Sequence, residues 1–135
     1  MSGPFDQLAI PASGMTTYKT WIDAISDNIA NINVARPMNE AAFQERYVVA
    51  QSASYGQGVG TGVKVAGVAF GDPKGRLVYE PQNPLAGPDG YVRYPDIDLS
   101  SQMSNLLVAQ RAYQLNISVL ERARDAYSQA LQIGK

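Results

Sequence analysis

A seven-residue repeat of apolar positions runs through the first part of the chain. Large apolar residues fill seven of its eight positions, and Pro11 is the exception. The repeat consists of Leu8, Met15, Ile22 and Ile29, each followed three residues later by Pro11, Tyr18, Ile25 and Ile32. Such a narrow line of apolar side chains, called the seam below, is typical of a coiled-coil helix. We therefore expect a helix over residues 12–35, which Pro11 kinks or begins and Pro37 ends.

A second apolar line predicts a helix at the other end of the chain. Its seam positions are Met103, Leu106, Tyr113, Ile117, Leu120, Tyr127 and Leu131, flanked by Ala109, Ala123 and Ala130. Gln110 and Arg124 fall in the same register, which weakens the repeat and indicates specified pairing. The helix is expected to start in PDIDLSSQ, where Asp96 or Asp98 can cap the free N–H groups, and to reach Ile133.

Glycine and proline separate the two predicted helices. Residues 36–95 hold nine of the 12 Gly and six of the 8 Pro, which indicates a turn-rich insert. Short strands are expected at residues 43–51, 62–70, 76–80 and 90–94. The GDPKG segment, residues 71–75, is typical of a hairpin turn, and residues 81–90 are expected to form a loop.

These elements predict an α+β fold class. Long N- and C-terminal helices would pair as an antiparallel coiled coil, with a small β-rich insert between them. The expected segments are an N-terminal coiled-coil helix over 1–35, a small β-rich insert domain over 36–95 and a C-terminal coiled-coil helix over 96–135. Two interpretations stay open from the pattern alone. The apolar side chains of the two seams either bury only each other, in a monomeric helical hairpin, or also pack against neighbouring chains.

The composition removes most of the usual parts of an enzyme. The chain has neither Cys nor His, so the thiolate, the commonest general base and the commonest metal ligand are missing. The glycine-rich segment 56–62 lacks the Gly-Lys-Ser/Thr run that opens a phosphate-binding helix. Asp96 and Asp98 are interpreted as helix caps rather than as a catalytic pair. We expect no catalytic residues, no metal and no cofactor, and hence no enzyme.

The charge pattern argues against nucleic acid as a partner, and the sequence shows no sign of a cleaved signal or of a membrane-spanning segment. The net charge is −1, and the arginines of the second helix alternate with acidic residues, which does not favour nucleic acid. The N-terminal residues lack the basic and apolar regions of a cleaved secretory signal. No apolar run approaches the ~18 residues that span a bilayer. We expect no direct membrane insertion, and export, if it occurs, without cleavage and by another route.

The segment SGMTTYKTWIDAISDNIANINVA resembles the axial proteins of the bacterial flagellum. Their first helix carries an Ala/Ser-x-Asn-Ile-Ala-Asn motif, matched here by Ser26, Asn28, Ile29, Ala30 and Asn31. The second half narrows the resemblance, because NPLAGPDGYVRYPDIDL, LLVAQRAYQLNISVL and LQIGK are similar to the C-type proximal rod proteins of the basal body. Residues 36–50 depart from the family pattern, since they lack its Thr-rich exit and basic Tyr-Arg-Arg run.

The resemblance implies a structural role in the flagellar rod. Similar proteins pair their terminal helices, which stack with rod neighbours, while a small β-rich domain faces outward. They are exported uncleaved through the flagellar type III apparatus, and they polymerise in the cell envelope into the drive shaft between the membrane ring and the distal rod. The implied partners are other rod subunits, proximal and distal, copies of the same chain and the export apparatus. The alternatives are another flagellar axial subunit or a soluble helical-hairpin module that binds peptides in an apolar groove.

The segment SDNIANIN, residues 26–33, carries three asparagines near the end of the predicted helix, although Asn is a poor helix former. The repeat places Asn28 and Asn33 on the two flanks of the seam and Asn31 further round the helix. We interpret them as residues that edge the seam and fix the register between helices through hydrogen bonds. The alternative is that they only loosen the helix end before Pro37. The residues expected at the subunit interface are Met15, Tyr18, Ile22, Ile25, Asn28, Ile29, Asn31 and Ile32, together with the seven seam residues of the second helix.

Overall fold

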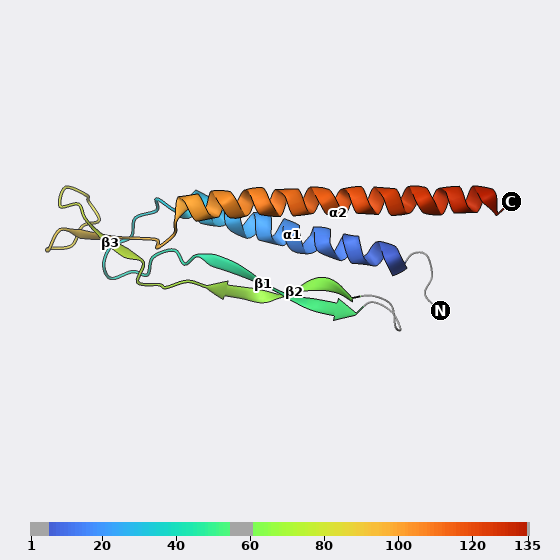
Figure 1. Cartoon of the computed structure of the whole chain (residues 1–135). Helices are drawn as coiled ribbons and strands as arrows, with labels where there is room; N and C mark the ends of the chain where they lie inside the picture. The colour runs from blue at the N-terminus through green and yellow to red at the C-terminus, as the bar shows by residue number, and fades with distance from the viewer. Residues whose placement is uncertain (1–5, 55–60, 135) are drawn as a thin grey trace. The chain divides into compact units, whose positions relative to one another are not determined.

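The computed structural model describes residues 6–54 and 61–134 of the chain (Figure 1). Its elements are α1 (Asp6–Asn31), β1 (Arg46–Ser54), β2 (Thr61–Phe70), β3 (Arg76–Tyr79), β4 (Tyr91–Tyr94) and α2 (Leu99–Ile133). β1 pairs with β2 in one two-stranded sheet, and β3 pairs with β4 in another. Two long helices thus flank a small β-rich part, which confirms the α+β fold class.

The ends of α1 differ from the expected ones. The helix begins at Asp6, so that Pro11 lies inside it, and it ends at Asn31 rather than at Ala35. The last helical residues give way to tighter turns, because the amide of Val34 bonds to the carbonyl of Asn31 at 3.1 Å. Asn31, Asn33 and Val34 are poor helix formers, and this local preference ends the helix before Pro37 can.

The start of α2 follows from one carboxylate. Asp98 precedes the first helical residue, and its side chain accepts hydrogen bonds from the backbone amide (3.1 Å) and the hydroxyl of Ser101. These hydrogen bonds lower the pKa of Asp98, and the bond from the Ser101 side chain is the largest cause. Of the two capping candidates, the structure therefore selects Asp98.

The chain divides into two compact units. The first unit comprises Met1–Ile22, Val48–Gly67 and Leu107–Lys135, and the second comprises Asp23–Tyr47 and Val68–Leu106. Each unit combines part of both helices with part of the strands between them.

Two small residues mark close approaches in the first unit. The hydroxyl of Ser13 on α1 donates to the carbonyl of Ile10 at 2.7 Å and accepts the amide of Val63 on β2 at 3.1 Å. Gly14 lies against α2, because a Cβ atom built on it would stand 2.7 Å from Oδ1 of Asn116. Glycine is therefore the residue that fits this approach of α1 to α2.

The second unit contains the β3–β4 sheet. The strands are antiparallel, with Leu77 opposite Arg93 and Tyr79 opposite Tyr91. Val92 in the centre of β4 is fully buried. On its other edge β4 forms an isolated bridge, in which the backbones of Arg36 and Arg93 exchange hydrogen bonds of 2.8 and 2.9 Å. This bridge ties the segment after α1 to the sheet.

The GDPKG segment forms a turn but not a hairpin. The amide of Lys74 bonds to the Asp72 side chain at 2.8 Å, and Gly75 adopts a left-handed conformation with φ of 60°. However, β2 and β3 on either side of the turn belong to different sheets. The turn pairs instead with the segment before β1, since the amide of Ala42 bonds to the carbonyl of Pro73 and that of Gly71 to Glu45. The predicted hairpin is therefore wrong.

The predicted loop 81–90 is a chain of turns held by its own polar groups. The backbone amides of Asn83, Ala86 and Gly90 each bond to the carbonyl three residues earlier, at 2.9–3.0 Å. The side chain of Asn83 donates to Glu80 at 2.8 Å and accepts the amide of Leu85 at 2.9 Å. Asn serves such turns well because its side chain mimics a backbone turn.

Candidate assembly surfaces

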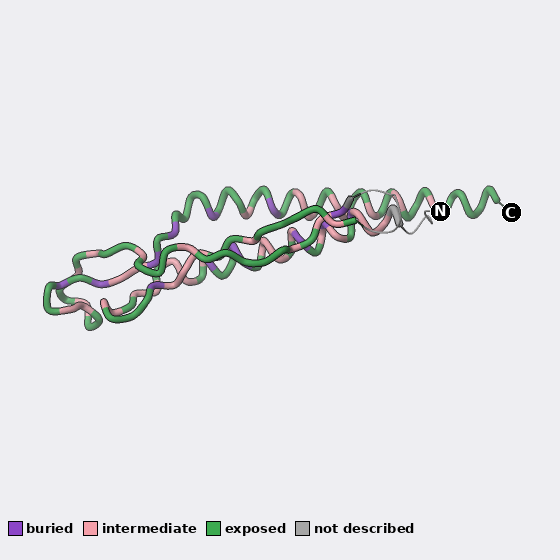
Figure 2. The backbone as a smooth tube through the Cα atoms, turned by 90° about the horizontal axis from the view of Figure 1, so that it is seen from below, coloured by how far each residue is buried: buried purple, intermediate pink, exposed green. Residues whose placement is uncertain are grey.

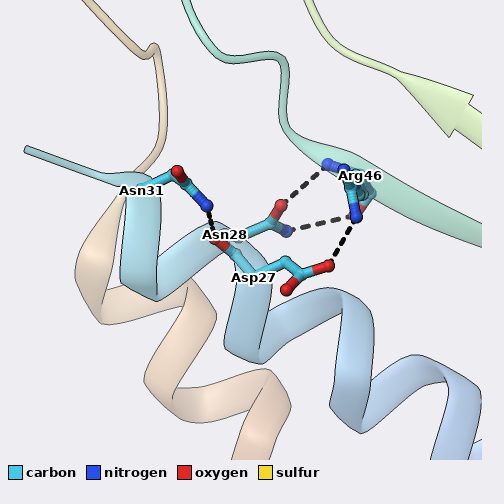
Figure 3. Close-up of polar contacts among 4 residues, drawn as sticks. All are labelled: Asp27, Asn28, Asn31 and Arg46. Carbon is cyan, nitrogen blue, oxygen red and sulfur yellow. Dashed lines mark hydrogen bonds and ion pairs between the residues drawn. The ribbon is translucent and has the colours of Figure 1, made fainter. Parts of the chain in front are cut away.

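A buried amide joins α1 to the start of β1 in the second unit (Figure 3). The side chain of Asn28 is 1% exposed. Its Oδ1 accepts the backbone amide of Arg46 at 2.9 Å, and its Nδ2 donates to the carbonyl of the same residue at 3.1 Å. One side chain therefore satisfies both backbone groups of Arg46. Leaving such groups unpaired costs about 1–3 kcal/mol each.

The same amide reaches α2. Nδ2 of Asn28 also donates to Oε1 of Gln102 at 3.0 Å, and Gln102 is 2% exposed. Nε2 of Gln102 in turn donates to the carboxylate of Glu45. Asn28, Gln102 and Glu45, called the amide cluster below, connect α1, α2 and the segment that leads into β1.

Two surface contacts border the amide cluster. Glu45 accepts the hydroxyl of Tyr47, and this hydrogen bond is the main cause that raises the pKa of Tyr47 to about 12. The guanidinium of Arg46 pairs with Asp27 on the exposed side of α1 (Figure 3). An exposed ion pair contributes about 0–1 kcal/mol, so the buried amides hold this junction and the ion pair adds little.

The structure corrects the predicted position of Asn28. The residue lies at the buried centre of its helix face and not on a flank. Asn31 is half-buried and donates to the carbonyl of Asp27 within its own helix at 2.8 Å, whereas Asn33 is exposed. The expected hydrogen bonding to neighbouring segments is thus confirmed for Asn28. Control of the register between helices stays a prediction.

The buried face of α1 is shifted relative to the predicted seam. Its buried residues are Pro11, Gly14, Thr17, Ala24, Ile25 and Asn28. Two of them, Pro11 and Ile25, occupy positions of the predicted repeat. The other positions of the repeat are half-buried: Leu8, Met15, Tyr18, Ile22, Ile29 and Ile32. The prediction was based on large apolar side chains alone. The close packing at Gly14 buries small and polar residues, which such a prediction does not include.

Most of the less exposed residues of α2 follow a seven-residue pattern. Gln102, Ala109, Asn116 and Ala123 share one position, and Leu106, Tyr113, Leu120 and Tyr127 share the other. Of the remaining predicted seam residues, Ile117 is half-buried, whereas Met103 and Leu131 are exposed. Sequence reasoning missed Gln102 and Asn116, because a search for apolar residues passes over polar ones. Their seven-residue spacing to Ala109 and Ala123 is the signal that could have found them.

One contact in each unit joins α1 to α2. Gly14 lies against Asn116 in the first unit, and Asn28 bonds to Gln102 in the second. From the first contact to the second, the position moves 14 residues forward along α1 and 14 residues back along α2. The residue numbers in each contact add up to the same value, as they do for facing positions of two antiparallel helices. A continuous coiled coil between them stays a prediction.

Most of α2 is exposed in the single chain. Gln102 and Ala109 are its only buried residues (Figure 2). In the first unit, six large apolar side chains of α2 are more than half exposed. We call four of them the outward stripe: Leu107, Val108, Leu115 and Val119. Val108, Leu115 and Val119 are spaced by seven and four residues, so they lie on one face of the helix. Exposed apolar stripes of this kind mark contact sites.

Two apolar hollows lie in the first unit. One, of about 350 Å³, is lined by Thr17, Tyr18, Trp21, Val48, Ala50 and Val63. The other, of about 280 Å³, lies between the helices and is lined by Ala12, Met15, Thr16, Lys19, Tyr113 and Leu120. Predicted interface residues thus line open space at the surface, where a side chain from another subunit would find apolar contacts.

Residues 6–54 and 61–134 contain no group of three or more acidic residues placed to hold a metal ion. None of the helices that the structure describes is long and apolar enough to cross a membrane.

Comparisons with known proteins show which proteins this chain is similar to. Residues 89–133 match the family described as flagellar basal body rod FlgEFG protein C-terminal. The chain is 35% identical over 127 residues to the flagellar basal-body rod protein FlgC of Salmonella typhimurium, covering 93% of this chain and 94% of the relative. It is 29% identical over 147 residues to the FlgC protein of Bacillus subtilis, with 97% and 98% covered. The FlgC protein of Borreliella burgdorferi is 28% identical over 148 residues, with 97% of each chain covered.

Proposed function

Because this chain belongs to the family of flagellar basal-body rod proteins FlgC, and is thus a structural subunit of the rod, we propose that it polymerises through the exposed faces of its two helices. The outward stripe of α2 carries this proposal. Leu115 is 66% exposed and Val119 is 53% exposed in the single chain. Burying a side chain of this size contributes about 2 kcal/mol, so a subunit gains free energy by covering the stripe.

The faces of the helices suit a repeating contact. The outward stripe differs from the hollow that Met15, Tyr113 and Leu120 line. A contact between two different surfaces of identical subunits repeats by rotation and rise, and it builds a tube rather than a closed dimer. The predicted interface residues, including the exposed Met103 and Leu131, belong to this proposal.

The proposal extends to partners and location. The neighbours are copies of this chain and other proximal and distal rod subunits, and the rod segment stands in the periplasm between the membrane ring and the distal rod. The subunit reaches it uncleaved through the flagellar type III export apparatus. Its role is mechanical, without catalysis. The resemblance of the terminal motifs to those of axial proteins supports these statements.

Complementation of swimming tests the proposal. Leu115→Asp and Val119→Asp place a charge on the outward stripe without touching the amide cluster, and we expect both to abolish swimming while helix content by circular dichroism stays unchanged. Ser104→Asp is the matched control, because Ser104 lies on α2, is already exposed and polar, and belongs to neither the seam nor the outward stripe. It should swim normally. Normal swimming of both stripe variants would refute assembly through this face.

A further inference from the structure

The β3–β4 sheet has one open edge. The amide of Glu80 bonds to the carbonyl of Gly90 at 2.8 Å, and hydrogen-bonded pairs alternate along an antiparallel ladder. Tyr79 and Leu77 therefore turn their backbone groups away from β4. The same alternation turns Arg93 outward on β4, where it meets Arg36. Among residues 6–54 and 61–134, no partner bonds to the outward groups of Leu77 and Tyr79.

The open edge carries exposed apolar side chains. Leu77 is 52% exposed and Tyr79 is 62% exposed. Both share a face of the sheet with Tyr91, whose ring lies 5.3 Å from that of Tyr79 between centroids. An unpaired edge with apolar side chains is a template for another strand. The surface therefore fits an extended segment that brings backbone donors, acceptors and an apolar side chain.

The sequence of β3 is complementary to itself. If two copies align antiparallel about Val78, Leu77 of each lies opposite Tyr79 of the other, and their outward backbone groups are in place to bond. Arg76 of each then lies opposite Glu80 of the other on the second face. Opposite charges and aliphatic–aromatic pairs directly across strands stabilise such a ladder. Apolar and charged positions both match in this single register.

We propose that β3 is a self-recognition edge, through which two copies of this chain join their β3–β4 sheets into one four-stranded antiparallel sheet. The contact is two-fold and closes on itself, so it cannot repeat along a polar rod. We therefore assign it to subunits that are not yet assembled. The paired strands are only four residues long, and the pairing is weak, since stable interfaces bury about 1,200 Å² or more.

Cross-linking tests the proposal cleanly, because the chain has no cysteine of its own. In the proposed register the two Val78 residues face each other as a non-hydrogen-bonded pair, at a spacing that suits a disulfide. Full-length Val78→Cys should form an intermolecular disulfide at least tenfold faster than Val49→Cys under mild oxidation. Val49 is the matched control, because it is an exposed valine on β1, outside the β3 edge. Equal rates for the two variants would overturn the proposal.

Charge reversal tests the register. In the Val78→Cys background, Arg76→Glu and Glu80→Arg should each slow cross-linking at least threefold, and the double reversal should restore it. Glu80 also accepts hydrogen bonds from Asn83 and Tyr94, so the near-UV circular dichroism of the tyrosines serves as the folding control. Failure of the double variant to recover, with this signal retained, would overturn the register. The Leu115→Asp change should leave cross-linking intact, because that variant fails only in rod assembly. Loss of swimming and loss of cross-linking thus report on different surfaces.

Discussion

The side chains of Asn28 and Gln102 are hydrogen-bonded at 3.0 Å, although 74 residues separate them in the sequence. Both are almost fully buried, and the first also satisfies the backbone of Arg46. A buried amide with several bonds is costly to lose, because its partners cannot reach water. This junction is therefore where the second unit should be most sensitive to substitution.

Asn28→Ala should lower the free energy of unfolding by about 3 kcal/mol, because it removes the partner of the Arg46 backbone groups and of Oε1 of Gln102. Asn33→Ala is the control, since Asn33 is exposed, and its effect should stay within about 0.5 kcal/mol. Urea unfolding followed by circular dichroism measures both. Equal stability of Asn28→Ala and Asn33→Ala would show that the amide cluster contributes nothing.

Gly14→Ala should depend on the residue at position 116. In a helix interior, alanine is favoured over glycine by about 1 kcal/mol, but here the added Cβ meets the Asn116 side chain. We expect little or no gain in the wild-type background and a gain of about 1 kcal/mol when Asn116 is changed to Ala. A double-mutant cycle in urea measures the coupling. An identical effect in both backgrounds would contradict the close approach of the helices.

Alkaline pH should destabilise the second unit through Tyr47. The hydrogen bond to Glu45 raises the pKa of this phenol from 10.0 to about 12. A raised folded-state pKa gives stability that is complete below pH 10 and is lost as the pH rises towards 12. Tyr94, whose pKa the hydrogen bond to Glu80 also raises, acts in the same direction. Thermal unfolding from pH 9 to pH 12 should therefore show a smaller alkaline loss in Tyr47→Phe than in Tyr79→Phe, the exposed control.

The Asp98 cap should make α2 sensitive to acid. The hydrogen bonds to Ser101 hold the pKa of Asp98 below 3.8, so its stabilisation is present above that pH and is lost as the pH falls through the lowered value. Asp98→Ala should destabilise the chain at pH 7 and show a shallower acid loss, whereas Asp98→Asn should keep much of the cap. Asp96→Ala is the control for a neighbouring carboxylate. An unchanged acid profile in Asp98→Ala would refute this role.

The hydrophobic pattern predicted the elements well because each has its own period and its own stop signals. The two helices and the four strands follow from local sequence, which also placed the cap of α2 at Asp96 or Asp98. The helix end at Asn31 was missed because the prediction gave Pro37 too much weight relative to the weak helix preference of the asparagines. The sheet pairing of β2 was missed because a turn sequence does not say which strands it joins.

The candidate surfaces were predictable only in part. Large apolar side chains located the two helical faces, but the buried centre of α1 contains Gly14 and Asn28, whose placement depends on residues about a hundred and 74 positions away. No local pattern records such partners. The outward stripe was not predicted either, because the sequence alone does not show which apolar side chains of α2 are buried within the chain and which stay exposed.

Electron cryomicroscopy of the assembled rod at side-chain resolution tests the central claim most directly. Leu115 and Val119, both exposed in the single chain, should be buried between neighbouring subunits. The Asn28–Gln102 contact should be retained within each subunit. A rod in which the outward stripe stays open to solvent would contradict assembly through this face of α2.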